Sequence, residues 1–345
     1  MAILRTAPAT LPSQTDNLHK PRDSRSAARW PPCRYDVRDM TFRDMLAMLA
    51  LAAVWGGSFL FLHVAAPVVG PVGLAAFRVG SAVLLLLPIV LLKRDGAQLL
   101  TYARPLLVCG LLAFGLPFLC LSVAARHLPA GLMSILNATT PMWGAFVGWL
   151  WLRERMHLTR SLGLILGLLG VALLTADKGA IPPGSGSLLA VALMLCATLS
   201  YALSVHVARR HLHALSPLSN AAGTLCMTAL VMVGPALWLG PQPVPPHTAQ
   251  YWHEVPGTVW AALLTLGIVC TGLAQIVFFR LIGRIGPNQA LTVTFLIPVF
   301  GMLWGALFLN ERITSWMLLS TVVIALGTWL ANRPAPLRSP PPVHP

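Results

Sequence analysis

Charged side chains are scarce in this sequence. Only 10% of its 345 residues are Asp, Glu, Lys or Arg, whereas soluble domains carry about 25%. Hydrophobic residues make up 56%, and the mean hydropathy is +0.73. So few charges cannot coat a soluble fold of this length, which excludes soluble enzymes, collagen-like chains and disordered regulators. The composition is that of an integral membrane protein.

Motifs for metal, nucleotide or catalytic chemistry are also missing. The six cysteines form no CxxC pair and five lie in apolar runs, so they predict neither a disulfide nor a metal site. No GxxxxGK[ST] loop is present, so ATP is not expected to drive the protein directly. The sequence has no HExxH motif and no paired carboxylates inside an apolar run, which disfavours an intramembrane enzyme. That alternative would gain only if Ser58 met a histidine in the folded protein. We expect no cofactor.

Ten apolar runs are long enough to cross a bilayer as helices, which takes about 20 residues each. They are numbered here as spans 1 to 10 and cover residues 45–66, 71–92, 105–125, 129–152, 158–175, 187–208, 217–239, 258–279, 287–309 and 314–331. The sequence therefore predicts an all-α integral membrane protein with ten transmembrane helices.

The basic residues indicate the orientation. With the N-terminus inside, 20 Lys and Arg fall in the inner segments, and only Arg126, Lys178 and Arg312 fall in the outer ones. Cytoplasmic loops carry this excess, so both termini are expected in the cytoplasm, with a bacterial inner membrane as the location. The net charge of +14 is thus explained by the membrane and not by nucleic acid. The expected partners are a small-molecule substrate and the lipid bilayer, with the chain as a monomer or homodimer.

The two tails lie outside the spans. Residues 1–43 are rich in Ala, Pro, Ser and Arg, lack apolar periodicity and are expected to form a disordered basic tail. They contain neither the apolar core of a signal peptide nor the composition of a transit peptide. Met40 and Met45, just before span 1, are alternative starting points for synthesis. Residues 333–345 form a C-terminal tail.

The chain contains an internal repeat. A shift of 157 residues aligns 106–174 with 263–331 without gaps and with 16 identities, seven of which fall in the 15 positions that begin at Pro141 and Pro298. Leucine richness alone would not place a proline, two glycines and a Glu-Arg pair in one register. The front parts align at a shift of 146, which pairs Trp55 with Tyr201.

Each repeat holds five spans, so the second copy must enter the membrane upside down. The repeats are expected at residues 44–176 and 187–332. Inverted repeats are typical of secondary transporters, whose binding site lies near the midplane where the two repeats meet.

The motifs carry a family resemblance. The first unit opens with Trp55-Gly56-Gly57-Ser58, has Arg78 in its second span, and in its fourth runs from Leu128-Pro129-Ala130-Gly131 to Glu154-Arg155. The second copy repeats the ending through Pro298 to Glu311-Arg312. This resembles the EamA unit of the drug/metabolite transporter superfamily over about residues 44–332. The resemblance implies a carrier of amino acids, other metabolites or drugs, mostly outward. The sequence departs from the family where Tyr201 replaces a tryptophan and Thr224 an arginine.

Two prolines near the middle of spans 4 and 9 point to a binding site. Pro141 and Pro298 each free the carbonyl four residues earlier, those of Asn137 and Thr294. A polar residue at an opened helix turn, in corresponding places of two inverted halves, is typical of a transporter site. The alternative is a kink that only shapes the bundle, with Thr294 bonding back to its own helix.

Arg78 is a further polar candidate, because it is the only Lys or Arg clearly inside a span. A cation there is costly and usually faces a polar interior, where it binds a substrate carboxylate or caps backbone carbonyls. Aromatic or polar candidates for substrate contact complete the set: Trp55, Ser58, Trp143, Tyr201 and Gln275.

The acidic residues all lie in tails, loops or span ends. Glu154 and Glu311, at the ends of spans 4 and 9, are interpreted as helix-end ion pairs or as gating residues. Because no carboxylate lies at the midplane, a mechanism with an embedded glutamate is disfavoured, and His63 is the nearest group for any proton linkage.

The sequence as a whole favours a secondary transporter that exports small metabolites such as amino acids by alternating access. The alternatives are an exporter of drugs or organic cations and, disfavoured, an intramembrane enzyme.

Overall fold

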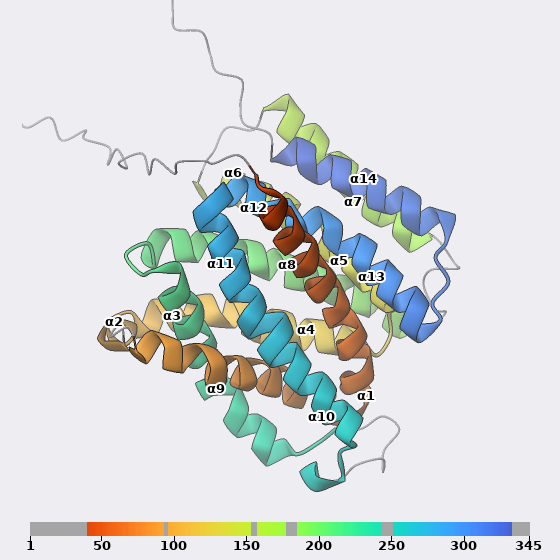
Figure 1. The fold of residues 1–345 in the computed structure, drawn as a ribbon. Coiled ribbons are helices and arrows are strands. Elements are labelled where there is room, and N and C mark those ends of the chain that lie inside the picture. The colour runs from red at the N-terminus through yellow and green to blue at the C-terminus, as the bar shows by residue number, and fades with distance from the viewer. Residues whose placement is uncertain (1–39, 93–95, 153–156, 177–184, 243–250, 333–345) are drawn as a thin grey trace, which may run out of the picture. The chain divides into compact units, whose positions relative to one another are not determined.

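The computed structural model describes residues 40–92, 96–152, 157–176, 185–242 and 251–332. Within these ranges the regular elements are all helices (Figure 1). This confirms the all-α membrane fold expected from composition.

The helices follow the predicted spans closely. Spans 1 and 2 are α1 (Phe42–Leu92), span 3 is α3 (Ala103–Gly110), η1 (Leu111–Gly115) and α4 (Leu116–Ala124), span 4 is α5 (Ala130–Asn137) and α6 (Thr140–Leu152), and span 5 is α7 (Leu158–Ala176). Spans 6 and 7 are α8 (Ser185–His211) and α9 (Pro217–Leu239); span 8 is α10 (Gly257–Leu264), η3 (Thr265–Leu273) and α11 (Ala274–Ile285); span 9 is α12 (Pro287–Leu291) and α13 (Val293–Leu309); span 10 is α14 (Ser315–Ala331). Two short helices, α2 (Gly96–Thr101) and η2 (Trp252–Glu254), lie between spans.

Seven helices in the described part are long and apolar enough to cross a membrane. One of them, α1, contains two predicted spans, because Gly70 has φ 74° and bends the chain between them. The two other predicted spans are the broken pair α5–α6 and the 17-residue α14. The described helices therefore accommodate ten crossings.

The helices extend beyond the apolar runs at several ends. Span 8 was expected to end at residue 279, but α11 continues past Arg280 and Arg284 to Ile285. It ends where Gly286 takes φ 84°. Hydropathy marks the edge of the hydrocarbon, whereas backbone conformation decides where a helix stops.

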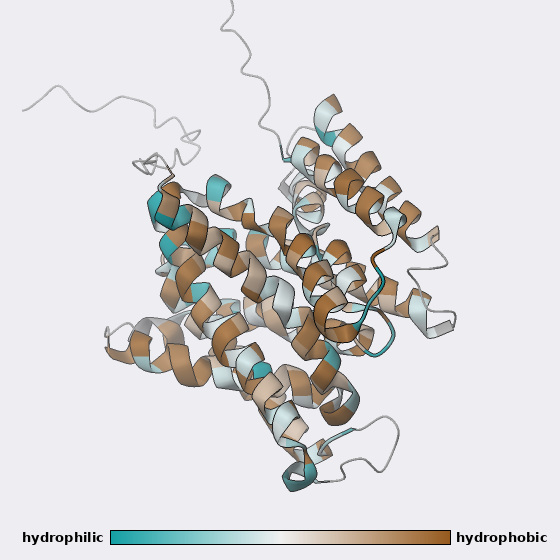
Figure 2. Cartoon of the chain, turned by 45° about the vertical axis from the view of Figure 1, so that its right-hand side comes forward, coloured by the Kyte–Doolittle hydropathy of each residue, from teal (hydrophilic) through white to brown (hydrophobic). Residues whose placement is uncertain are grey.

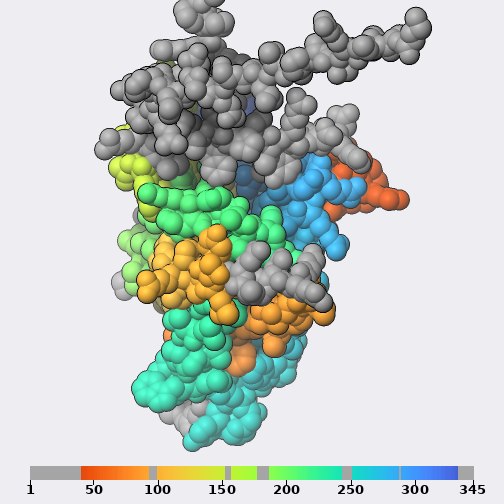
Figure 3. Space-filling model, turned by 90° about the vertical axis from the view of Figure 1, so that its left-hand side faces the viewer, coloured from red at the N-terminus to blue at the C-terminus, as the bar shows by residue number. Residues whose placement is uncertain are grey.

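Contacts between helices come in pairs related by the repeat. Span 2 packs on span 7 (α1 on α9), span 4 on span 9 (α5 on α13) and span 5 on span 10 (α7 on α14) (Figure 1). In the other half, α8 packs on α6 as α1 packs on α13. Likewise, α8 and α9 pack on η1 as α1 packs on η3. Figure 3 shows α3, α8 and α9 lying side by side on one face. Two copies of one unit that pack against each other produce this pattern.

Equivalent glycines lie at equivalent helix crossings. A Cβ at Gly267 would collide with Ser81 and with the carbonyl of Arg78. A Cβ at Gly110, the same position of the first repeat, would collide with the carbonyl of Thr224 and the hydroxyl of Thr228. Small residues let helices approach closely in lipid. Span 2 thus touches span 8 through one glycine, and span 7 touches span 3 through the other.

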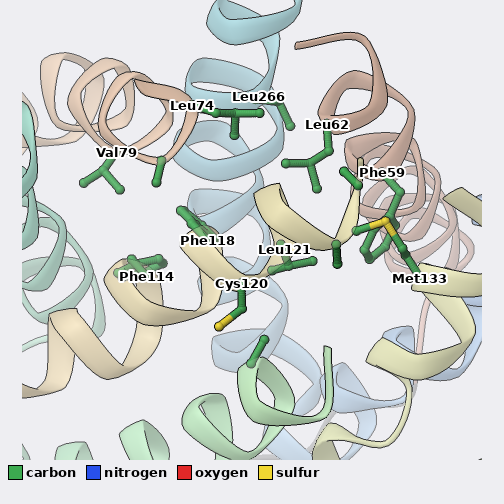
Figure 4. Packing of buried hydrophobic residues seen from close by; sticks show 14 of the residues in the cluster. Phe59, Leu62, Leu74, Val79, Phe114, Phe118, Cys120, Leu121, Met133 and Leu266 are labelled. Carbon is green, nitrogen blue, oxygen red and sulfur yellow. The ribbon is translucent and has the colours of Figure 1, made fainter. Parts of the chain in front are cut away.

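The core and the lipid-facing surface are both apolar. Figure 4 shows Phe59, Leu62, Val79, Phe118 and Leu266 in the buried cluster, contributed by α1, α4 and η3. Many large apolar side chains are exposed, such as Leu84 and Trp238, and brown apolar segments cover the helices in Figure 2. A surface of this kind is stable in hydrocarbon and not in water.

Candidate functional site

Arg78 lies buried inside the helix bundle. It is seven residues beyond Pro71, roughly 10 Å into span 2 at ~1.5 Å per residue, and only 6% of it is exposed. Its Nε donates a hydrogen bond of 3.0 Å to the hydroxyl of Thr271 in span 8. Its Cζ lies 3.9 Å from the ring centroid of Phe118 in span 3, a cation–π contact. The two repeats therefore both contribute to the surroundings of this cation.

No carboxylate of the described residues offsets the charge of Arg78. Tyr201 and Cys270 lie within electrostatic range of the guanidinium, but both are neutral side chains at ordinary pH. Among the residues that the structure describes, no carboxylate pairs with Arg78; the ion pairs there are Asp44–Arg284 and the contact of His253 with Glu254. A buried cation in this state is costly unless an anion or further hydrogen bonds join it.

The helices beside Arg78 contain wide, π-helical turns. η1 in span 3 and η3 in span 8 occupy overlapping positions of the two repeats. Such turns are frequent at functional sites. Within η3, Thr271 donates its hydroxyl to the carbonyl of Leu266, five residues back, at 2.8 Å. The same hydroxyl accepts the Arg78 bond, so the wide turn positions the partner of the arginine.

Side chains from spans 1 and 6 bind carbonyls of these wide turns. Trp55 donates its indole Nε1–H to the carbonyl of Cys270 at 3.2 Å. In the other half, Ser200 donates its hydroxyl to the carbonyl of Leu112 at 2.7 Å. Ser200 directly precedes Tyr201, which the repeat alignment pairs with Trp55. The two halves thus satisfy their wide turns in the same way with different side chains.

Three predicted site residues come together here, namely Trp55, Arg78 and Tyr201, around Cys270 and Thr271. The buried Ser58 donates its hydroxyl to the carbonyl of Trp55 in its own helix at 2.7 Å. Gln275 is half-buried and lies two residues beyond η3. Their contact with a substrate stays a prediction.

The kinked spans 4 and 9 differ from each other. In span 4 the helix breaks between Asn137 and Thr140, and the hydroxyl of Thr140 donates 2.8 Å to the Asn137 carbonyl that Pro141 frees. In span 9 the break is at Thr292, while Pro298 lies within α13. Proline opens a turn without having to end the helix.

The polar residues at these kinks have different surroundings. The hydroxyl of Thr294 donates a hydrogen bond of 2.8 Å to the carbonyl of Leu291. This is the bond back to its own span that is expected if the kink only shapes the bundle. Trp143 is half-buried beside Phe146, with ring centroids 5.9 Å apart. Its buried indole nitrogen has no hydrogen-bond partner among the described residues. Spans 4 and 9 pack closely at Ser134 and Gly301, where a Cβ on the glycine would collide with the serine. That the kink residues border one cavity stays a prediction.

Only one of the two glutamates predicted at the ends of spans 4 and 9 lies in the described part of the chain. Glu154 lies outside the described residues. Glu311 accepts backbone hydrogen bonds from Ala130 and Gly131 at the start of α5, at 2.6 and 2.9 Å. It is thus a cap on a helix of the other repeat.

Sequence reasoning missed Thr271 and Phe118. Both lie in apolar runs without a motif, and a wide turn changes which side of span 8 faces inward. The glycines at 267 and 272 are the one signal that could have marked span 8 as tightly packed at this level.

Thr224 occupies the place that corresponds to Arg78 in the second repeat. It is buried, donates its hydroxyl to the carbonyl of Asn220 at 2.7 Å, and faces Gly110 across the crossing of spans 7 and 3. Within the described residues, only the first repeat has a buried cation at this position, so the site is asymmetric.

Known proteins resemble this chain along most of its length. It is 28% identical over 299 residues to an uncharacterized transporter of Bacillus subtilis, YvbV, across 84% of this chain and 92% of that protein. It is 24% identical to a probable amino-acid metabolite efflux pump of Escherichia coli K12, across 84% and 95% of the two chains. One solved crystal structure shares the fold with a TM-score of 0.57 at 16% identity, covering 84% of this chain and 96% of that one.

The model of the EamA-like transporter family matches the chain twice, over residues 43–176 and 188–333. Both copies contain five predicted spans, and the family and its named relatives are transporters rather than enzymes. This multi-pass membrane protein belongs to the EamA-like transporter family.

Proposed function

We propose that this protein exports small carboxylate-bearing metabolites, of which amino acids are the leading class, across the cytoplasmic membrane by alternating access. The observation that carries the proposal is the buried guanidinium of Arg78. It has a neutral hydrogen-bond partner, an aromatic face and, within the described residues, no carboxylate. A substrate carboxylate would supply the missing negative charge and the bidentate geometry that arginine favours.

The surroundings of Arg78 fit such a substrate. Phe118 covers one face of the guanidinium, and Tyr201 and Cys270 lie close to it. Arg78 would repel a permanent organic cation, because the repulsion between like charges is stronger in the low-dielectric interior of the bundle than in water. The named relatives that are probable amino-acid metabolite efflux pumps support the same class.

The proposed orientation places both termini in the cytoplasm. The exposed Arg209 and Arg210 at the end of α8 and Arg280 and Arg284 in α11 then lie on the inner side, where anionic lipids attract them. Arg126 and Arg312, at the α4–α5 and α13–α14 connections, lie on the outer side. We place the protein in a bacterial inner membrane on this basis.

Transport by purified protein in proteoliposomes tests the substrate class. Uptake of labelled amino acids should exceed uptake of tetraphenylphosphonium, and Arg78→Ala should reduce the amino-acid uptake by about tenfold or more, the effect of one charged hydrogen-bonded contact. Arg78→Lys should retain part of it, because the charge remains. Arg126→Gln serves as the matched control, since Arg126 donates to the carbonyls of Ala66 in α1 and Gln242 after α9 and, among the described residues, is not bonded to Arg78, Thr271 or Phe118.

Strong uptake of tetraphenylphosphonium that ignores Arg78→Ala would contradict the proposal. It would favour the exporter of drugs or organic cations instead.

A further inference from the structure

Two cysteines from different repeats meet where α4 packs on α8. Cys120 lies in α4, in span 3, and Cys196 lies in α8, in span 6. Both thiols are free, and they are hydrogen-bonded to each other. The two residues share no motif in the sequence, so only the packing of the two repeats brings them together.

The register of the two spans supports this contact. Cys109 donates its thiol to the carbonyl of Ser204 at 3.5 Å, and Ser200 donates its hydroxyl to the carbonyl of Leu112 at 2.7 Å. A later residue of span 3 thus meets an earlier residue of span 6, as in two antiparallel helices. The thiol pair continues this series. Figure 4 shows the sulfur of Cys120 pointing from α4 toward the green ribbon of α8.

The two sulfurs differ in access. Cys120 is 4% exposed, whereas Cys196 is exposed near the middle of α8. Cys196 shares its side of the helix with the exposed Leu189 and Ala192, because these residues follow one another at helical spacing. An exposed apolar side of a membrane-spanning helix faces lipid. A ligand that comes through the lipid therefore reaches Cys196 first, and it must be uncharged, since an ion in hydrocarbon is costly.

Two thiols without further ligands fit a soft metal ion of low coordination number. Sulfur ligands select soft ions, whereas zinc sites in proteins take three or four protein ligands. Among the described residues, no group of three or more His, Cys, Asp or Glu could hold a metal ion. Mercury(II) binds two thiolates in a line and forms a complex without net charge, which a low dielectric favours. Mercuric chloride is itself neutral and dissolves in lipid.

We propose that Cys120 and Cys196 form a dithiol site for one mercury(II) ion between the two repeats. Mercuric chloride exchanges one chloride for the sulfur of Cys196 and then the other for the sulfur of Cys120. Two Hg–S bonds form and two Hg–Cl bonds break, the two thiol protons leave with the two chlorides, and mercury keeps its oxidation state. The bound ion ties span 3 to span 6, whichever substrate is carried.

The corresponding place in the other half holds no thiols. The repeat alignment pairs Cys120 with Val277 and Cys196 with Ala50, both of them apolar. The chain should therefore bind a single mercury ion in this way.

Competition with a monothiol tests the site without any substrate. Protein in lipid nanodiscs is loaded with mercuric chloride and washed with rising concentrations of 2-mercaptoethanol, and the retained mercury is measured by mass spectrometry. A second ligand on the same molecule raises affinity by about 10²–10⁴. Wild type should therefore keep one mercury per chain at concentrations about a hundredfold above those that strip Cys120→Ala or Cys196→Ala.

Cys226→Ala is the matched control, because Cys226 is a half-buried thiol of span 7 outside the pair. It should retain mercury as wild type does. X-ray absorption at the mercury edge gives a second measurement on wild type alone, which holds even if the variants fold poorly. Protein loaded with one equivalent, before any monothiol is added, should show two sulfur neighbours.

Equal retention by wild type and either folded variant, or a single sulfur neighbour in the loaded wild type, would overturn the site. A loss of retention in Cys226→Ala would do the same, because it would assign the mercury to another thiol. None of these results bears on the proposed substrate class, which rests on Arg78.

Discussion

The indole N–H of Trp55 and the carbonyl of Cys270 form a hydrogen bond of 3.2 Å across 215 residues of sequence. This bond joins span 1 to the wide turn in span 8 that also positions Thr271 against Arg78. The aromatic residue that opens the first repeat is thus tied to the framework of the arginine site. Any contact that it makes with substrate comes from the rest of its ring.

Trp55→Phe should destabilise the protein by about 1–3 kcal/mol, because a buried carbonyl loses its partner. Ser200→Ala should cost a similar amount through the carbonyl of Leu112. Thermal unfolding in detergent, followed by size-exclusion chromatography, measures both. Equal stability of wild type and both variants would show that water or lipid replaces these bonds at no cost.

Gly267→Ala and Gly110→Ala should each destabilise the protein, by about 1–3 kcal/mol for overpacking, since the added methyl meets backbone or hydroxyl atoms of the facing span. Gly144→Ala and Gly283→Ala have no atom within 4 Å of the new Cβ and serve as matched controls. They should be neutral or slightly stabilising. The yield of monodisperse protein after heating distinguishes the two pairs, and equal loss in all four variants would contradict the crossings.

Trp143→Phe should lower transport by about tenfold, the effect of one lost hydrogen bond in a buried site, if its unpartnered indole N–H binds the substrate. Trp149→Phe, in the same helix but 41% exposed, should leave transport unchanged. Initial rates in proteoliposomes, normalised to inserted protein, make the comparison. Wild-type rates for Trp143→Phe would remove this residue from the site.

The orientation is tested at two exposed positions on opposite sides of the proposed topology. With native thiols masked, an impermeant maleimide should label Tyr251→Cys in intact cells and Arg210→Cys only after permeabilisation. Tyr251 precedes η2, and Arg210 lies at the end of α8. His247, in the same predicted outer segment as Tyr251, lies outside the described residues. The reverse labelling pattern would invert the membrane orientation.

The spans and the repeat were determined by the sequence itself. Crossing a bilayer requires a long apolar run, and a bend requires a local cause such as Gly70 or Pro141, so both are visible along the chain. The repeat was visible because its prolines, glycines and Glu-Arg pairs kept their spacing. Arg78 was visible because it is the only Lys or Arg clearly inside a span.

The partners of these residues were decided by the tertiary structure. Thr271 is 193 residues from Arg78, and Glu311 is 181 residues from Ala130. Each meeting depends on how two inverted halves pack. A wide turn in span 8 rotates the residues after it, and a left-handed Asn310 turns Glu311 back onto α5. Hydropathy and spacing carry no information on either, because they report the length and polarity of a helix and not the direction in which one side chain faces its neighbour.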